Sequence, residues 1–351
     1  MASLVLAGGG ILASSAATAH PASGAVGYEP PRARTPDAPA AIIAKVRGTD
    51  LSGGTLDVDN GNYLLFSSTA FGNQRDNVPL IVGRPGDWSA PVDALPVLPS
   101  WALPVTQGGT TWQPQVDRLG SHYVLYYSAT VRDTRPLIHC LGTATSATMM
   151  GPYVPSALPI VCQTNQGGDI DAEMVMDNTS SVSRPYLVWK SDNNSGHDHG
   201  TDRIWSQQLA ANGLRVVGSP TVIYGTDVAP AWARPIVEAP QMVSSPFGGW
   251  WLFYSGGDGF TTPRYGIGVA KCESITGPCT PVGTKPLIMT NRQGVGPGEE
   301  TFYRTAGSDW LLYDPWHSGI AFKWFRPIAA ARIGWTPAGP YVAEAGSFPS
   351  P

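Results

Sequence analysis

The amino-acid sequence predicts an all-β fold, and three observations support that prediction. The chain of 351 residues contains 41 glycines and 33 prolines, which favour tight turns. Only 14% of the residues are charged, whereas a coiled coil or a helical bundle needs far more Lys, Glu and Arg. No amphipathic run is long enough for the crossover helices of a parallel α/β sheet. The class that remains is a compact, loop-rich protein made of short strands.

Charge and hydropathy exclude several kinds of function. The net charge of −4 gives no basic surface, so we expect neither nucleic acid nor an anionic membrane as a partner. Hydrophobic residues make up 42% of the chain, which excludes a disordered polypeptide. The chain has 12 Trp and 13 Tyr residues. Such side chains often bind flat ligands with polar rims, although most of them fill the core.

The first element in chain order is a segment typical of export. Residues 4–19 are an apolar run of small residues, shorter than the ~20 residues that span a bilayer, and Ala17, Thr18 and Ala19 form an A-x-A cleavage pattern. We interpret residues 1–19 as a signal peptide with a truncated start, because no basic residue precedes the apolar run. Residues 20–40 are then an extended lead-in to one domain, residues 41–351, of an extracellular protein.

Four cysteines agree with export to an oxidising compartment. They allow three pairings, and we expect the local one, which joins Cys140 to Cys162 and Cys272 to Cys279 and closes short loops. The spacing does not resemble a zinc site, because no C-x-x-C is present.

Five copies of a hairpin pattern follow one another along the rest of the chain. The second strand of each hairpin begins with Tyr or Trp directly after a turn rich in Gly, Asn or Ser. These strands begin at roughly 60-residue intervals, which indicates a repeated unit. They are expected at residues 63–68, 123–128, 186–191, 251–255 and 310–313.

A further strand follows the hairpin in the second, third and fourth units, at residues 140–146, 204–209 and 267–270. Five antiparallel sheets arranged radially form a five-bladed β-propeller, in which repetition shields the sheet edges. Length alone would suggest two domains, at roughly 150 residues each, but the even repeat predicts one. A large sandwich would explain the strands but not the even interval.

Ligands of a propeller bind where the innermost strands meet at the axis, so we looked for acids ahead of each hairpin. Asp and Glu total only 26. Glu238 lies among aliphatic residues and prolines ahead of the fourth hairpin. Burial there would raise its pKa, and a protonated carboxyl near neutral pH suits general-acid catalysis. A single acid is also often a structural residue that is capped or paired.

The third unit offers three acids within five residues, namely Asp169, Asp171 and Glu173. Alternation along a strand would place all three on one face. Asp171 occupies the position that corresponds to Glu238 and is our choice, with Glu173 as the second choice.

The first unit offers Asp50, ahead of its hairpin. Asp57 and Asp59 lie nearer the turn, where we expect solvated side chains. The second unit has no acid at this point but has Trp112, which could stack on a sugar ring or fill the core.

These motifs, in this order, resemble glycoside hydrolase family 43, five-bladed propeller enzymes that act on arabinofuranosides and β-xylosides. The resemblance runs from about residue 50 to residue 342. Val-Glu-Ala-Pro at 237–240 looks like the family's general-acid motif, and Ile-Asp-Ala at 170–172 looks like its Ile-Asp-Pro segment. Further matches lie at 112–114, 267–270, 277–278, 296–298, 312–313 and 326–335.

The resemblance implies hydrolysis with inversion. Asp50 would activate water, Glu238 would protonate the leaving oxygen, and Asp171 would orient Glu238 and keep its proton affinity high. Trp112 would stack on the sugar and Arg326 would bind its hydroxyls. The implied partner is a carbohydrate such as arabinan or xylan, and we expect a monomer.

The sequence departs from the family pattern at three places. Asp50 precedes Leu rather than Pro, Asp171 precedes Ala rather than Pro, and Glu299 replaces the His of Gly-Pro-Gly-His. That His helps to hold a central metal, commonly calcium, in relatives that have one. The chemistry requires no cofactor, and Glu299 could still serve a hard cation.

Two other functions remain compatible with the sequence. A propeller that has lost its general base would bind arabinan or xylan without releasing sugar. A propeller enzyme acting on fructosides would share the fold and a catalytic set of three acidic residues, but the motif around Glu238 favours family 43.

Overall fold

The structure is a computed structural model, and it describes residues 41–44, 51, 53–69, 75–194, 200–291, 294–316, 326–343 and 348–351. Strands make up nearly all of its regular structure. None of the helices in these ranges is long or apolar enough to cross a membrane. The segments predicted as signal peptide and lead-in lie outside the described residues. The described helices are single 3-10 turns at Val105–Gln107, Thr164–Gln166 and Ala231–Ala233.

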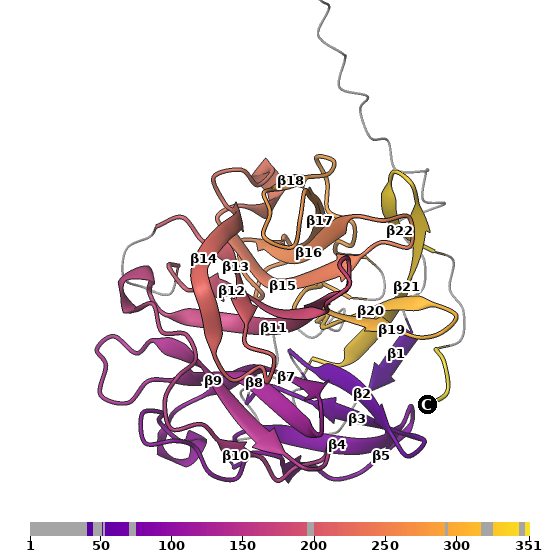
Figure 1. Ribbon diagram of the computed structural model, residues 1–351. Coiled ribbons are helices and arrows are strands. Elements are labelled where there is room, and N and C mark those ends of the chain that lie inside the picture. Colours follow the sequence, from indigo (N-terminus) through magenta and orange to yellow (C-terminus); the bar gives the residue numbers. More distant parts are fainter. Residues whose placement is uncertain are drawn as a thin grey trace, which may run out of the picture.

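The strands form five antiparallel sheets around a central axis, which confirms the predicted five-bladed β-propeller (Figure 1). In blades 1 to 4 the strands follow one another in sequence order from the axis outward. Blade 1 consists of β2 (Thr55–Asp59), β3 (Asn62–Phe66), β4 (Pro79–Arg84), β5 (Asp87–Trp88) and β6 (Val92–Asp93). Blade 2 consists of β7 (Thr111–Leu119), β8 (His122–Thr130), β9 (His139–Ser146) and β10 (Val154–Pro155).

Blades 3 and 4 have four strands each. Blade 3 consists of β11 (Asp169–Asp177), β12 (Arg184–Ser191), β13 (Arg203–Leu209) and β14 (Val216–Gly225). Blade 4 consists of β15 (Ile236–Ser244), β16 (Trp250–Gly257), β17 (Gly266–Cys272) and β18 (Cys279–Pro281).

Blade 5 joins the two ends of the propeller. Its first strand in the sequence, β1 (Ala41–Ala44), pairs antiparallel with β21, so a strand from before blade 1 completes the last blade. This pairing closes the ring, and closure leaves few free sheet edges. The other strands are β19 (Thr301–Arg304), β20 (Asp309–Tyr313), β21 (Ile328–Thr336) and β22 (Gly339–Val342).

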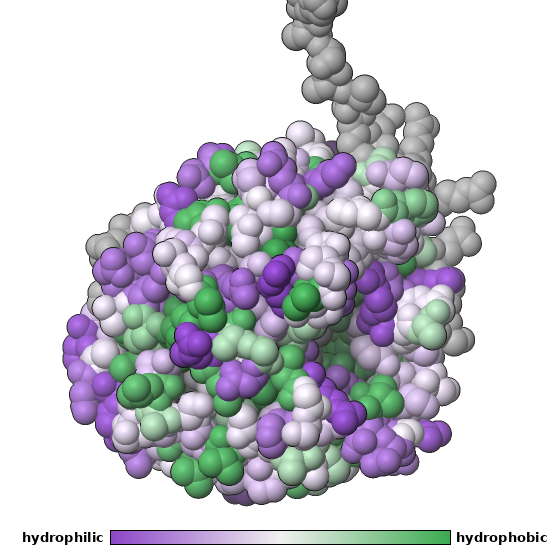
Figure 2. Space-filling model, viewed as in Figure 1, coloured by the Kyte–Doolittle hydropathy of each residue, from purple (hydrophilic) through white to green (hydrophobic). Residues whose placement is uncertain are grey.

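The predicted hairpin strands are β3, β8, β12, β16 and β20, the second strand of each blade, and the predicted third strands are β9, β13 and β17. Buried apolar side chains form five clusters, one at each interface between neighbouring blades. Between blades 1 and 2, for example, Leu64 packs in one cluster with Leu125. Burying one such side chain contributes about 1.5–3 kcal/mol. On the face in Figure 2, hydrophobic and hydrophilic residues are interspersed.

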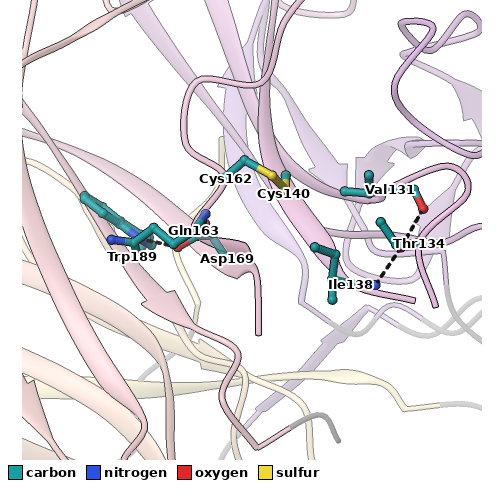
Figure 3. Close-up of a disulfide and its surroundings, with 8 residues drawn as sticks. All are labelled: Val131, Thr134, Ile138, Cys140, Cys162, Gln163, Asp169 and Trp189. Carbon is teal, nitrogen blue, oxygen red and sulfur yellow. Dashed lines mark hydrogen bonds between the residues drawn. A yellow bond between two sulfur atoms is a disulfide. The ribbon is translucent and has the colours of Figure 1, made fainter. Parts of the chain in front are cut away.

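Both predicted disulfides are present. Cys140–Cys162 ties β9 to the segment that leads into β11, and Cys272–Cys279 ties β17 to β18 within blade 4. Figure 3 shows the first of them beside the start of β11, so this disulfide fixes the approach of the chain to the innermost strand of blade 3.

Candidate active site

Each of the five blades has a residue with positive φ at or just before its innermost strand, at an equivalent position. These residues are Gly53, Gln113, Asp171, Ala239 and Glu299, with φ of 58°, 43°, 58°, 49° and 57°. In β7, β11 and β15 the strand register shifts at this point. Non-glycine residues in this conformation persist only where the surroundings hold them, and they cluster at functional sites. We call these five residues the axial bulges.

A side-chain oxygen near the end of the second strand of the preceding blade holds four of the axial bulges. In blades 2, 3 and 5 the acceptor is a serine within two residues of the end of the second strand. The bonds run from Gln113 N–H to Ser68 Oγ (3.0 Å), from Asp171 N–H to Ser128 Oγ (3.1 Å), from Glu299 N–H to Ser255 Oγ (2.9 Å) and from Gly53 N–H to Asp314 Oδ2 (2.6 Å).

The fifth axial bulge is held differently. The N–H of Ala239 donates to Oδ2 of Asp171 at 2.9 Å. Because Ala239 directly follows Glu238, the carboxylate of Asp171 fixes the backbone beside the Glu238 side chain. The structure therefore brings together two of the three residues predicted to be catalytic. The third, Asp50, lies outside the described residues.

The expectation that the three acids of β11 share one face is wrong. The positive φ of Asp171 and the shift of register between Ile170 and Glu173 interrupt the alternation of side chains. Oε2 of Glu173 instead accepts the N–H of Met242, in the next blade, at 2.6 Å.

Glu173 has two counterparts that show its role. Gln115 and Gln241 stand at the same position of β7 and β15, two residues after the axial bulge. Their Oε1 atoms accept backbone N–H groups of the next blade, those of Met174 and Phe302, at 2.8 and 2.9 Å. Glu173 thus makes the bond that glutamine makes in blades 2 and 4, so it is a structural residue.

Asp169 is also engaged in structure. Its Oδ1 accepts the indole N–H of Trp189 at 2.9 Å, and its Oδ2 accepts the backbone N–H of Gln163 (Figure 3). Gln163 directly follows the disulfide residue Cys162. Asp169 therefore anchors the entry to blade 3.

Two residues from other parts of the chain contact the buried carboxyl group of Glu238. The hydroxyl of Tyr265 lies 2.7 Å from Oε1, and Nζ of Lys190 lies 3.1 Å from Oε2. Lys190 is fully buried and also contacts Oδ1 of Asp192 at 3.2 Å and Oδ1 of Asn194 at 2.6 Å. Burial disfavours the ammonium, but the negative charges of Glu238 and Asp192 outweigh it and raise the pKa of Lys190.

Glu299 lies on the other side of Tyr265. Its Oε1 is 3.0 Å from the hydroxyl of Tyr265, and its Oε2 accepts the side-chain N–H of Gln113 at 3.0 Å. Burial, and then the negative charge of Glu238, raises the pKa of Glu299 to about 7, whereas Arg326 lowers it.

These residues do not fit a directly bound calcium ion. Protein donors face both carboxylate oxygens of Glu299. Across the described ranges, no three His, Cys, Asp or Glu side chains are grouped in a way that could hold a metal ion. We therefore assign no step to a metal.

Two further acids complete the cluster around Glu238 and Glu299. Burial raises the pKa of Asp171 well above its usual value, and the negative charges of Glu299 and Glu238 add to this effect. Burial likewise raises the pKa of Glu300, whose Oε2 accepts the hydroxyl proton of Ser255. Burial and the charges of neighbouring acids thus favour the protonated forms of Asp171, Glu299 and Glu300.

The two residues predicted to bind substrate lie beside this cluster. Arg326 is buried, and its guanidinium lies 5.1 Å from the ring centre of Phe260 and 5.4 Å from that of Trp316. Trp112 directly precedes the axial bulge of blade 2, is half-buried and stacks on His139 with 3.9 Å between ring centres.

Thr55, Gln115, Gln241 and Thr301 are among the residues that line a cavity of about 10 Å³ beside the axial bulges, with room for about one water molecule.

One further expectation needs correction, and two contacts of the site had no clear signal in the sequence. Asp57 lies within β2 rather than in a turn, and burial raises its pKa to about 7.

Lys190 is a lone cation in an apolar strand run, which is a weak signal for a buried ion pair. Nothing in the residues around Tyr265 distinguishes it from other tyrosines of the core.

Comparison with known proteins agrees with the fold. Residues 86–340 match the family described as glycosyl hydrolases family 43. No curated protein sequence matches the chain significantly.

Among similar solved structures is a thermostable family-43 glycoside hydrolase, with a TM-score of 0.69 and 18% identity, covering 86% of this chain and 95% of that one. An exo-1,5-alpha-L-arabinanase from a bovine ruminal metagenomic library has a TM-score of 0.65 and 17% identity, covering 85% and 97%. An alpha-L-arabinofuranosidase from Lactobacillus brevis has a TM-score of 0.66 and 15% identity, covering 86% and 95%.

Proposed function

The chain belongs to glycosyl hydrolase family 43, and we propose that it is a secreted, inverting glycoside hydrolase acting on arabinofuranosyl- or xylosyl-containing polysaccharides or oligosaccharides. The observation that best supports this proposal is the bond from Ala239 N–H to Asp171 Oδ2, which couples two buried acids on neighbouring blades. The arabinanase and the arabinofuranosidase among the similar structures favour an arabinose-containing substrate.

In the proposed mechanism Glu238 is the general acid. It donates a proton to the leaving oxygen as the glycosidic bond breaks, and Asp50, as general base, activates the attacking water. An inverting pair stands roughly 6.5–9.5 Å apart, which leaves room for that water. Asp171 acts through the backbone, because its carboxylate holds Ala239 and thereby the direction of the Glu238 side chain.

We propose that the substrate binds at the axial end of the propeller, over the axial bulges. One face of the Trp112 ring stacks on His139, which holds the ring in place so that a sugar ring can stack on it. Arg326 offers hydrogen-bond donors to sugar hydroxyls close to Glu299. Residues 1–19 would direct the enzyme out of the cell, and the two disulfides suit an oxidising compartment.

The Glu238→Gln substitution tests the mechanism. General-acid catalysis contributes about 10²–10⁴-fold, so we expect a loss of that order for arabinan or an alkyl arabinofuranoside, measured as reducing ends released. The exposed Glu273 provides the matched control, and Glu273→Gln should hydrolyse at the wild-type rate. Unchanged turnover by Glu238→Gln would refute the assignment. If the wild-type protein binds arabinan without releasing sugar, the propeller is a binding module instead.

A further inference from the structure

The hydroxyl of Tyr265 lies between two carboxyl groups. It is 2.7 Å from Oε1 of Glu238 and 3.0 Å from Oε1 of Glu299; Tyr265 and Glu238 are buried, and Glu299 is half-buried. Glu238 comes from β15, Tyr265 from the segment before β17 and Glu299 from the segment before β19. Both distances are hydrogen-bond distances.

If both carboxyl groups are ionised, the two hydrogen-bond contacts have only one proton between them. A phenol donates a single hydrogen bond, so it can serve only one of the two carboxylates. Burial raises the pKa of Tyr265 well above its usual value, and the phenol therefore keeps its proton. The second contact is satisfied only when a carboxylic acid donates to the phenol oxygen. The chain of bonds then runs from a protonated carboxyl through Tyr265 to a carboxylate.

The other oxygen of each carboxyl group shows where that proton resides at rest. Oε2 of Glu238 faces the ammonium of Lys190, which stabilises a carboxylate. Oε2 of Glu299 faces the neutral amide of Gln113. The pKa of Glu299, about 7, agrees with a proton on this residue.

We propose that Glu299 stores the proton that Glu238 donates to the substrate, and that Tyr265 conducts it between them. This inference rests on the proposed function of Glu238. In the transfer the O–H bond of Glu299 breaks, its proton binds the phenol oxygen, and the original phenol proton binds Oε1 of Glu238. One proton moves in total, Tyr265 ends as a phenol, and Glu299 becomes the carboxylate.

The transfer explains how Glu238 can act as an acid although it is paired with the ammonium of Lys190. A carboxylate paired with a buried ammonium cannot act as an acid until a proton reaches it. Tyr265 supplies a path for that proton, since its buried hydroxyl contacts both Glu238 and Glu299 and also has a hydrogen bond with Ser255. Charged and titratable groups that face this pair from the neighbouring elements are Asp171, Lys190, Glu300 and Arg326.

Kinetics of Tyr265→Phe and Glu299→Gln on two substrates test the transfer. For an alkyl arabinofuranoside, whose leaving group needs a proton, we expect kcat/KM to fall about 10–100-fold in each variant. For a dinitrophenyl arabinofuranoside, whose leaving group needs none, we expect changes of less than about 3-fold. The double variant should be no slower than the slower single one, because both act in one path.

The control is Tyr224→Phe, which removes another buried phenol hydrogen bond, the one to Tyr254 at 2.9 Å, without touching a carboxyl group. It should retain wild-type kinetics on both substrates. Equal losses on both substrates in Tyr265→Phe, or losses that multiply in the double variant, would overturn the proposal, because they would indicate a structural role.

An infrared measurement tests the stored proton without any substrate. Near pH 6, below the pKa of Glu299, the spectrum of the wild type minus that of Glu299→Gln should show one carbonyl band of a protonated carboxyl that shifts in D2O. Absence of that band would overturn the proposal. If the band is present but the wild type hydrolyses no glycoside, the proposed function fails while the shared proton stands.

Discussion

Replacing Lys190 by Met would remove the cation from the buried cluster of acids. Met retains most of the apolar length of the lysine side chain, so the main change is the loss of one charge. Lys190 is fully buried and its Nζ contacts Glu238, Asp192 and Asn194 at 3.1, 3.2 and 2.6 Å. Without it, two carboxylates would be buried next to each other without this counter-charge.

The expected cost follows from the burial of the pair. Removing one partner of a buried ion pair typically destabilises a protein by about 3–5 kcal/mol. With an unfolding entropy of ~2.1 cal/mol/K per residue and roughly 300 residues in the propeller, each kcal/mol lowers the Tm by about 1.6 °C. We therefore expect the Tm of Lys190→Met to fall by about 5–8 °C near pH 8.

The loss should be smaller at low pH. Burial raises the pKa of Asp202 to about 7, although Lys190 lowers it, so the folded state binds more protons than the unfolded state. Stability therefore falls as the pH rises from about 4 through 7. Loss of Lys190 raises the folded pKa of Asp202 further, which extends the fall to higher pH. The Tm difference between variant and wild type should widen from pH 5 to pH 8.

Differential scanning calorimetry at pH 5, 6.5 and 8 measures this effect. Lys271→Met is the matched control, because Lys271 is an exposed lysine on β17 and its loss should change the stability by less than about 0.5 kcal/mol. A Tm loss of the same size at pH 5 and pH 8, or one below about 2 °C at pH 8, would refute the electrostatic role of Lys190.

Two further predictions concern the substrate and the disulfides. Trp112→Ala should raise KM for arabinose oligosaccharides about 10-fold and leave kcat nearly unchanged, because it removes the surface that stacks on the sugar; an unchanged KM in initial-rate measurements would exclude this role. Serines in place of Cys140 and Cys162 should lower the free energy of unfolding by about 3 kcal/mol, and serines in place of Cys272 and Cys279 by about 2 kcal/mol, because the closed loops span 22 and 7 residues. Urea denaturation checks this order, and a reversed order would contradict the loop argument.

The blades could be predicted because their signals are local. A turn of Gly, Asn or Ser followed by an aromatic run specifies a hairpin within a few residues, and five such hairpins at even intervals specify the repeat. Asp171 and Glu238 could be proposed as catalytic candidates for a related reason, because acids are scarce in the chain and these two stand in apolar segments.

The remainder of the site depends on neighbours that are distant in the sequence. Lys190 and Glu238 are 48 positions apart in the sequence, and Tyr265 and Glu238 are 27 positions apart. Neither separation repeats elsewhere in the site. The side chains of β11 do not alternate regularly, because a bulge at Asp171 rotates the strand. The strand β11 contains no glycine that would have indicated this bulge in the sequence. The sequence therefore identifies the acids but not the groups that set their protonation.

The location of the site follows from a break in the repeat. Four axial bulges are held by a serine or an aspartate at the end of the preceding blade's second strand. Blade 3 also has a serine there, Ser191, but its hydroxyl donates to the carbonyl of Arg203 at 3.4 Å. Asp171 takes over the role of acceptor for blade 4, so the position of one acid fixes the backbone that directs the other, Glu238. Lys190 directly precedes Ser191 and faces Glu238 at this same interface. Two of the three acids proposed for the reaction, Asp171 and Glu238, are thus coupled between blades 3 and 4, because there the bond that joins two blades is made by an acid of the site.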